Sequence, residues 1–143
     1  MSKSDTFEND LLKLIFNGTA IANLADNAAG APLTNLYLSL HTADPGDAGN
    51  QSTSEVAYIG YARVAVLRTS AGWIITTNSV SPVASIEFPE KTGAADGIAT
   101  YASVGTTATG TGKILYSGAL SPTIAYANGV TPRIKTTSTI TED

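Results

Sequence analysis

The stretch Leu36-Tyr-Leu-Ser-Leu-His41 alternates apolar and polar side chains. Successive side chains of a β-strand point to opposite faces, so this alternation predicts a strand with one apolar face. The next segment, residues 42–50, is dense in turn formers and includes Asp44-Pro45-Gly46, which predicts a loop that continues through Glu55. From Pro32 onward the apolar period is therefore two, and the sequence indicates a β-rich fold.

Seven further short segments have the composition of strands and are separated by turn formers. Their residue ranges are 61–68, 73–76, 85–88, 97–104, 113–119, 123–127 and 133–141. Among the intervening turns, Asn128-Gly129 is a strong signal for a β-hairpin. Many short strands with regular turns are typical of a β-sandwich or barrel. Strands do not alternate with long helical segments, which disfavours a doubly wound sheet.

Residues 5–16 predict one amphipathic helix before the strands begin. Asp5 is placed to cap it, and a glutamate three residues later gives capping-box spacing. Gly18 suits the left-handed position that ends a helix. Four apolar residues at helical spacing form the expected buried stripe: Phe7, Leu11, Leu14 and Ile15. Leu12 and Phe16 fall outside this stripe, which indicates a helix that is buried on more than one side.

The length of 143 residues is that of one ordinary domain. We therefore expect a single β-sandwich domain over residues 1–143, with the helix in 1–18 and the strands in 32–141. A second short helical turn is expected around residues 21–24. The chain has no cysteine, which excludes disulfides, thiolate zinc sites and thiol catalysis.

Charge and hydropathy limit the classes of partner. The net charge is −4 and the 8 Lys and Arg residues are scattered, so nucleic acid is not expected as a partner. No apolar run approaches the ~18 residues of a membrane span, and the N-terminus lacks an apolar signal region, so no membrane partner is expected. Charged residues make up 14% of the chain, against about 25% in ordinary soluble domains. A surface of hydroxyls and small side chains suits a protein covered by neighbours, with a secreted β-domain as the alternative.

His41 is the only histidine and the first candidate for chemistry. It could be a general base or a metal ligand, or a strand-end side chain that faces solvent or hydrogen-bonds a loop carbonyl. We favour the structural interpretation, because a lone titratable residue needs a partner to form a site. Serine catalysis would depend on this one histidine, and no Gly-x-Ser-x-Gly sequence is present.

Two loops resemble ligand sites only superficially. Residues 105–113 are glycine-rich and include a lysine, but lack the spacing and the Ser or Thr of a phosphate-binding loop, and are expected to form a hairpin loop. Residues 44–50 carry Asp44, Asp47 and Asn50, which leaves a calcium site as a hypothesis, although EF-hand spacing is absent. We predict no catalytic residue, no metal ligand and no cofactor.

Residues 36–46, together with Ser54-Glu-Val-Ala-Tyr-Ile-Gly-Tyr-Ala-Arg-Val64, resemble small virion proteins of tailed bacteriophages. Among these, the resemblance is greatest to cement, or capsid decoration, proteins of the kind found in a short-tailed Bordetella phage, and it is specific over residues 36–66. It implies a jelly-roll-like antiparallel β-sandwich on the outer surface of the capsid. The implied partners are the major capsid protein and a second copy in a homodimer, and the chain would be made in the host cytoplasm. The resemblance implies no active site.

Two segments are the expected docking surfaces: the apolar stripe of the N-terminal helix and the C-terminal strand, which could add to a neighbour's sheet edge. Their residues are Phe7, Leu11, Leu14, Ile15, Arg133, Ile134, Lys135 and Ile140. A phage tail or fibre component is the first alternative. A carbohydrate- or receptor-binding module is the second, and burial of Tyr58, Tyr61 and Trp73 would count against it. A hydrolase built on an unrecognised pair of carboxylates is the third.

Overall fold

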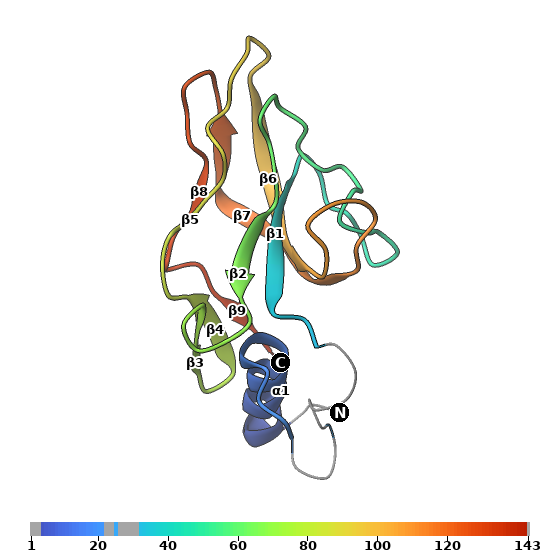
Figure 1. The fold of residues 1–143 in the computed structure, drawn as a ribbon, viewed down its shortest axis with the longest axis vertical. Coiled ribbons are helices and arrows are strands. Elements are labelled where there is room, and N and C mark those ends of the chain that lie inside the picture. The colour runs from blue at the N-terminus through green and yellow to red at the C-terminus, as the bar shows by residue number, and fades with distance from the viewer. Residues whose placement is uncertain (1–3, 22–24, 26–31, 143) are drawn as a thin grey trace. The chain divides into compact units, whose positions relative to one another are not determined.

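The computed structural model describes residues 4–21, 25 and 32–142 (Figure 1). The chain divides into two compact units. The helix unit consists of Met1–Asn35, Leu67–Ser85 and Lys135–Asp143, and the sheet unit consists of Leu36–Val66 and Ile86–Ile134. The predicted fold class is confirmed: the chain is mainly β, with antiparallel sheets and one N-terminal helix. The single-domain organisation stays a prediction, and residues 22–24 of the expected second helical turn lie outside the described residues.

Helix α1 (Asp5–Asn17) begins and ends with capping residues. Ser4, in an extended conformation, is the N-cap, and its side chain accepts a hydrogen bond of 3.4 Å from the backbone N–H of Phe7. The expectation of Asp5 at this position was wrong, because the helix already includes Asp5. Gly18 ends the helix with φ 65°, and its N–H donates to the carbonyl of Lys13, as its freedom to adopt a left-handed conformation predicted.

The buried face of α1 differs from the predicted stripe. Leu12 and Phe16 have no exposed surface, and Glu8, one turn before Leu12, is also buried. The Phe16 ring meets Trp73 edge-on, with centroids 4.7 Å apart. The four predicted stripe residues are only half-buried. The spacing of apolar residues predicted one stripe and left Leu12 and Phe16 outside it. The face that carries these two residues is the more deeply buried one, because the large aromatic side chains of Phe16 and Trp73 pack against each other there.

In the helix unit, α1 packs on a small sheet of order β3-β4-β9. Its strands are β3 (Trp73–Thr76), β4 (Ser79–Pro82) and β9 (Ile140–Thr141). The predicted bounds of β3 are confirmed, whereas β4 lies where turn formers were expected, between the predicted strands 73–76 and 85–88. Pro82 lies at the end of β4, opposite Trp73, where a strand tolerates proline.

Arg68 completes the helix unit by capping the C-terminal turn of α1. Its Nε donates to the carbonyl of Ile15 over 2.6 Å, and its Nη2 donates to the carbonyl of Leu14 over 2.5 Å. The last four carbonyls of an α-helix have no partner N–H within the helix, and a positive charge near this end interacts favourably with the helix dipole. Burial lowers the pKa of Arg68. A side chain 53 residues away from Ile15 in sequence thus adds to the cap that Gly18 makes at this end of the helix.

The sheet unit contains a four-stranded antiparallel sheet of order β2-β1-β6-β7. The strands are β1 (Asn35–His41), β2 (Val64–Leu67), β6 (Gly97–Gly105) and β7 (Ile114–Tyr126). β6 and β7 form an antiparallel hairpin, and the loop between them is the hairpin loop that the sequence predicted. The two segments predicted at 113–119 and 123–127 form one strand, because Ser121-Pro122 lies within a register irregularity of β7 rather than in a turn.

A two-stranded pair, β5 (Ile86–Glu87) and β8 (Arg133–Ile134), completes the sheet unit. The predicted strand 133–141 is therefore wrong as a continuous element, because its two ends belong to β8 and β9. The turn at Asn128-Gly129 forms, with φ 78° at Gly129. It does not make a hairpin, because β7 and β8 on either side of it lie in different sheets.

Candidate interaction surface

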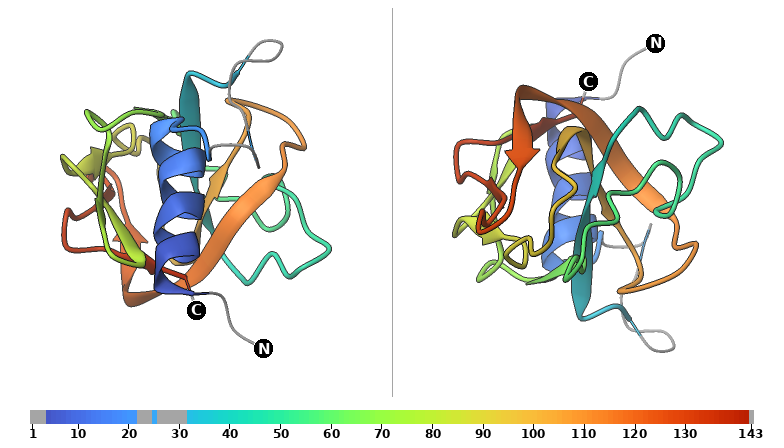
Figure 2. Two further views of the ribbon diagram at one scale, coloured as in Figure 1. Left: turned by 90° about the horizontal axis from the view of Figure 1, so that it is seen from below. Right: turned by 90° about the horizontal axis from the view of Figure 1, so that it is seen from above.

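Two loops of the sheet unit contact each other. Loop A (residues 42–63) connects β1 to β2, and loop B (residues 106–113) connects β6 to β7 (Figure 2). The backbone N–H of Gln51 donates to the carbonyl of Gly112 over 2.9 Å, and the hydroxyl of Ser52 donates to the carbonyl of Gly110 over 2.8 Å. Direct hydrogen bonds therefore join the two loops.

Arg63 is the main connection between the loops, and only 3% of its side chain is exposed. Its guanidinium forms a fork with the carboxylate of Glu55, with Nε–Oε1 and Nη2–Oε2 distances of 2.7 Å each. Its Nη2 also donates to the carbonyl of Gly110 over 2.7 Å, and its Nη1 donates to the carbonyl of Thr107 over 3.1 Å. A bidentate pair with both loops as acceptors fixes loop A against loop B.

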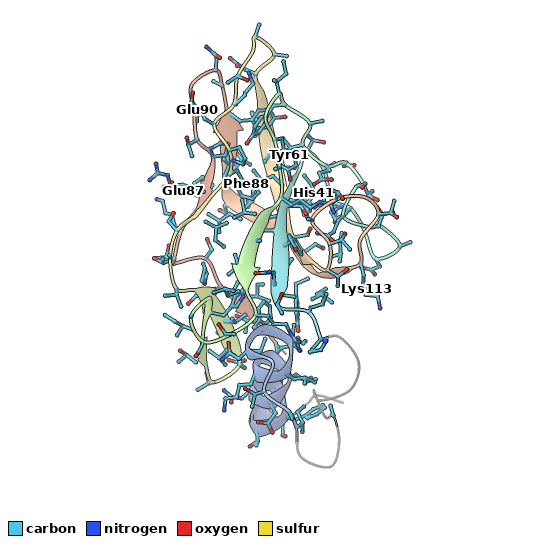
Figure 3. The ribbon with its side chains drawn as sticks, in the orientation of Figure 1. His41, Tyr61, Glu87, Phe88, Glu90 and Lys113 are labelled. Carbon is cyan, nitrogen blue, oxygen red and sulfur yellow. The ribbon has the colours of Figure 1, made fainter. Side chains whose placement is uncertain are left out.

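Tyr61 links this ion pair to the sheet. Its hydroxyl donates to Oε1 of Glu55 over 3.1 Å and accepts a hydrogen bond of 2.9 Å from the backbone N–H of Leu40 in β1. Burial, together with the nearby Glu55, raises the pKa of Tyr61 well above its ordinary value. The ring stacks on Phe88, with centroids 6.1 Å apart (Figure 3). The phenol of Tyr61 therefore stays protonated, and its hydrogen bonds link loop A to β1.

Gln51 fixes loop B from inside. It has no exposed surface, its Oε1 accepts a hydrogen bond of 3.0 Å from the N–H of Thr107, and its Nε2 donates to Ser39 Oγ over 3.2 Å. A Cβ atom at Gly105 or at Gly112 would lie 2.1 Å from the Gln51 side chain. These two glycines are therefore required by the close approach of the glutamine.

His41 forms a buried pair with Ser103 of β6. The two residues are 0% and 2% exposed, and Nε2 of His41 lies 2.8 Å from Ser103 Oγ. Nδ1 lies 2.8 Å from the carbonyl of Thr53, which can only accept, so Nδ1 carries the proton and Nε2 accepts from the serine. The interpretation of His41 as a partner of a loop carbonyl is confirmed, and the solvent-facing alternative was wrong. The pair lacks an orienting carboxylate and an exposed hydroxyl, so its geometry serves structure.

Acid is expected to destabilise the sheet unit through His41. Burial lowers the pKa of His41 below its ordinary 6.5, so the unfolded chain takes up the proton first as the pH falls. The contribution of His41 is fully present above pH 6.5 and is lost as the pH falls below it. Urea unfolding at pH 8 and pH 5 should show a larger loss of stability for the wild type than for His41→Gln. Equal losses in the two proteins would contradict this account.

An open cleft of about 380 Å³ lies beside loop A in the sheet unit, and Tyr58 and Tyr126 line it. Both tyrosines are buried, their ring centroids are 5.3 Å apart, and the Tyr58 hydroxyl donates to the carbonyl of Pro89 over 2.7 Å. The Lys91 ammonium, also buried, donates to the carbonyl of Gly93 and lies 3.4 Å from Asp96. The aromatic and basic groups of the cleft are thus occupied by contacts within the chain.

The aromatic side chains named as a test of the carbohydrate-binding alternative are not displayed. Tyr58 and Trp73 are buried. Tyr61 is half-buried, and its hydroxyl is hydrogen-bonded to Glu55 and to the backbone of Leu40. A sugar-binding platform needs exposed aromatic faces, so this arrangement counts against that alternative.

The calcium hypothesis receives no support from the loop 44–50. Oδ1 of Asp44 accepts from the N–H of Gly46, and Oδ1 of Asn50 accepts from the N–H of Ser52, both over 2.9 Å. These oxygens close turns of the backbone. Across residues 4–21, 25 and 32–142, no group of three or more His, Asp or Glu side chains could hold a metal ion.

The predicted docking residues fall in different environments. The four on α1 are half-buried, as is Ile140 in β9, whereas Arg133 and Lys135 are exposed. Ile134 is buried in β8 and belongs to the core. β8 pairs with β5 and β9 pairs with β4, so the backbone of this segment already has partners in its own chain. A docking role for these residues stays a prediction.

A family described as podophage GP4 fiber I protein gp80 matches residues 2–141 of this chain. No curated protein matches it. In the part of the chain that the structure describes, no helix has the length and apolar character needed to cross a membrane.

Proposed function

The chain belongs to the podophage GP4 fiber I protein gp80 family, and on this premise we propose that it is a non-enzymatic structural subunit of a podophage fibre. The match extends over residues 2–141, and this observation carries the proposal. The chain is thus a phage structural protein, as its resemblance to virion proteins implied. The match does not support the specific likeness to the Bordetella cement protein, and it fits the fibre alternative better than the cement role.

The arrangement of the titratable groups supports a structural role. Arg63 and Glu55 neutralise each other, Tyr61 joins them to β1, and His41 is hydrogen-bonded through both ring nitrogens. These four side chains are thus engaged in holding the loops. In our proposal, these contacts fix the shape of loops A and B so that a virion neighbour meets a preformed surface.

The exposed tips of the two loops are the proposed contact surface. They are rich in hydroxyls and small residues, and the exposed ones include Ser52, Ser54, Thr107, Thr109 and Thr111. Rigid loops lose less conformational entropy on binding than mobile ones, so a modest interface can be sufficient. In a fibre, the repetition of such contacts multiplies their strength.

Disruption of the gene in the phage that encodes this chain tests the proposal. We expect particles that package DNA and resist heat like the parent, but lack a fibre and adsorb poorly to host cells. A complementing plasmid should restore both the fibre and adsorption. Particles that keep their fibres but lose their DNA at lower temperature would overturn the fibre role and favour the cement role, in which the partner is the major capsid protein.

A further inference from the structure

β7 is the edge strand of the four-stranded sheet and has features that are unusual for an exposed edge. It pairs with β6 on one side, and no strand in the described part of the chain pairs with its other side. It is 13 residues long, whereas strands are usually about 3–10 residues long. Its sequence, ILYSGALSPTIAY, contains no charged residue. Edge strands normally avoid association by being short or by carrying charges, and β7 does neither.

The middle of β7 is uncovered on both faces. Ser117, Gly118 and Ala119 are consecutive and all exposed, although successive side chains of a strand point to opposite faces. A Cβ atom added to Gly118 would have no atom of the chain within 4 Å. These three residues pair in regular register with residues 101–103 of β6, so the strand is correctly formed where it is exposed.

The ends of this stretch carry the features that stop strand pairing. Lys113 precedes β7, and Pro122 lacks the N–H that a ladder needs. The β6–β7 ladder has two register irregularities, one between Ile114 and Tyr116 and one between Ala119 and Ile124. The segment that we consider for pairing is therefore Ser117 to Ala119, which lies between the two irregularities and has Gly118 at its centre.

We propose that this segment of β7 pairs antiparallel with the same segment of a second copy of the chain, and so joins two four-stranded sheets into one. The segment suits a copy of itself, because it is uncharged and has its smallest residues at its centre. A two-fold axis perpendicular to the sheet that passes through one residue places the residue before it opposite the residue after it in the other copy. With the axis at Gly118, Ser117 of one copy lies opposite Ala119 of the other. This contact rests on the proposed function: a two-fold contact joins two copies and would be one of the several subunit contacts that a fibre requires.

Charge substitutions at the opposed positions test the pairing. Ser117→Lys with Ala119→Lys places like charges opposite each other in both symmetric positions, whereas Ser117→Lys with Ala119→Glu places opposite charges there. By light scattering on the purified chain, the wild type and the Lys/Glu variant should be dimers, and the Lys/Lys variant should show an at least tenfold higher dissociation constant. Ala84→Lys, at an exposed position outside β7 and outside both loops, is the matched control and should leave the dimer unchanged.

Cysteine cross-linking locates the contact, because the natural chain contains no cysteine. Gly118→Cys lies at the proposed axis, and oxidation should convert it to a covalent dimer, whereas Ala84→Cys should run as a monomer in the same denaturing gel. A wild type that is monomeric at every concentration tested, or a Lys/Lys variant that dimerises like the Lys/Glu variant, would overturn the pairing. These measurements need no virion, so their failure is distinguishable from failure of the fibre role.

Discussion

Replacement of Arg63 by alanine is expected to lower the free energy of unfolding of the sheet unit by about 3–5 kcal/mol, because it leaves the carboxylate of Glu55 without its partner. Only 3% of the Arg63 side chain and 17% of the Glu55 side chain are exposed, so water cannot replace the lost contacts fully. The carbonyls of Thr107 and Gly110 lose a donor as well. Urea unfolding followed by circular dichroism measures the loss.

Two variants make this result specific. Arg63→Lys keeps the charge but cannot form the fork, so it should lose most of the same stability. Arg133→Ala removes an ion pair with Glu87, in which both side chains are more than half exposed and the charges are 3.8 Å apart. Exposed pairs contribute about 0–1 kcal/mol, so this control should change little. A loss for Arg63→Ala no larger than that for Arg133→Ala would show that the loops do not depend on the buried pair.

Leu12→Ala is expected to destabilise the helix unit by about 2–5 kcal/mol, while Leu11→Ala, one position away on the same helix, should cost clearly less. Leu12 has no exposed surface, whereas Leu11 is half-buried. The two substitutions remove the same atoms and change helix propensity equally, so their difference reports burial alone. Thermal unfolding of the two variants gives the comparison.

The same pair decides between the predicted and the observed face of α1. If Leu11→Ala proved the more damaging, the apolar stripe inferred from the sequence would be the packed face and the role of Leu12 would be wrong. The stripe through Phe7, Leu11, Leu14 and Ile15 would then be unavailable to a partner. With the expected order, the stripe keeps apolar surface that a virion neighbour could cover.

The fold was predictable where local rules act and less so where distant segments meet. Alternation in residues 36–41 predicted β1, and the glycine-rich segment 105–113 predicted the loop of the β6–β7 hairpin. Turn formers were expected between residues 76 and 85, yet Ser81-Pro82 lies in β4, because a proline at the end of a strand loses no hydrogen bond that the sheet needs. Asn128-Gly129 makes its turn, yet the partners of β7 and β8 are chosen by long-range pairing that a dipeptide does not encode.

The polar contacts of the loops were the least predictable feature. Arg63 looks like one of several scattered basic residues until the fold brings it to Glu55, eight positions earlier in sequence, and to loop B, more than 40 positions later. The contacts of Gln51 have one signal in the sequence: Gly105 and Gly112 flank loop B, which must approach the Gln51 side chain closely. The contact between Ser103 and His41 has no signal in the sequence, since Ser103 is one of many serines in the predicted strands.

Cryo-electron microscopy of the particles of the phage that encodes this chain, with the chain traced into the density, tests the central claim most directly. The account predicts that the chain lies in a fibre, with loops A and B against a neighbouring virion protein. Density for the chain on the outer capsid shell, bridging copies of the major capsid protein, would contradict the fibre role.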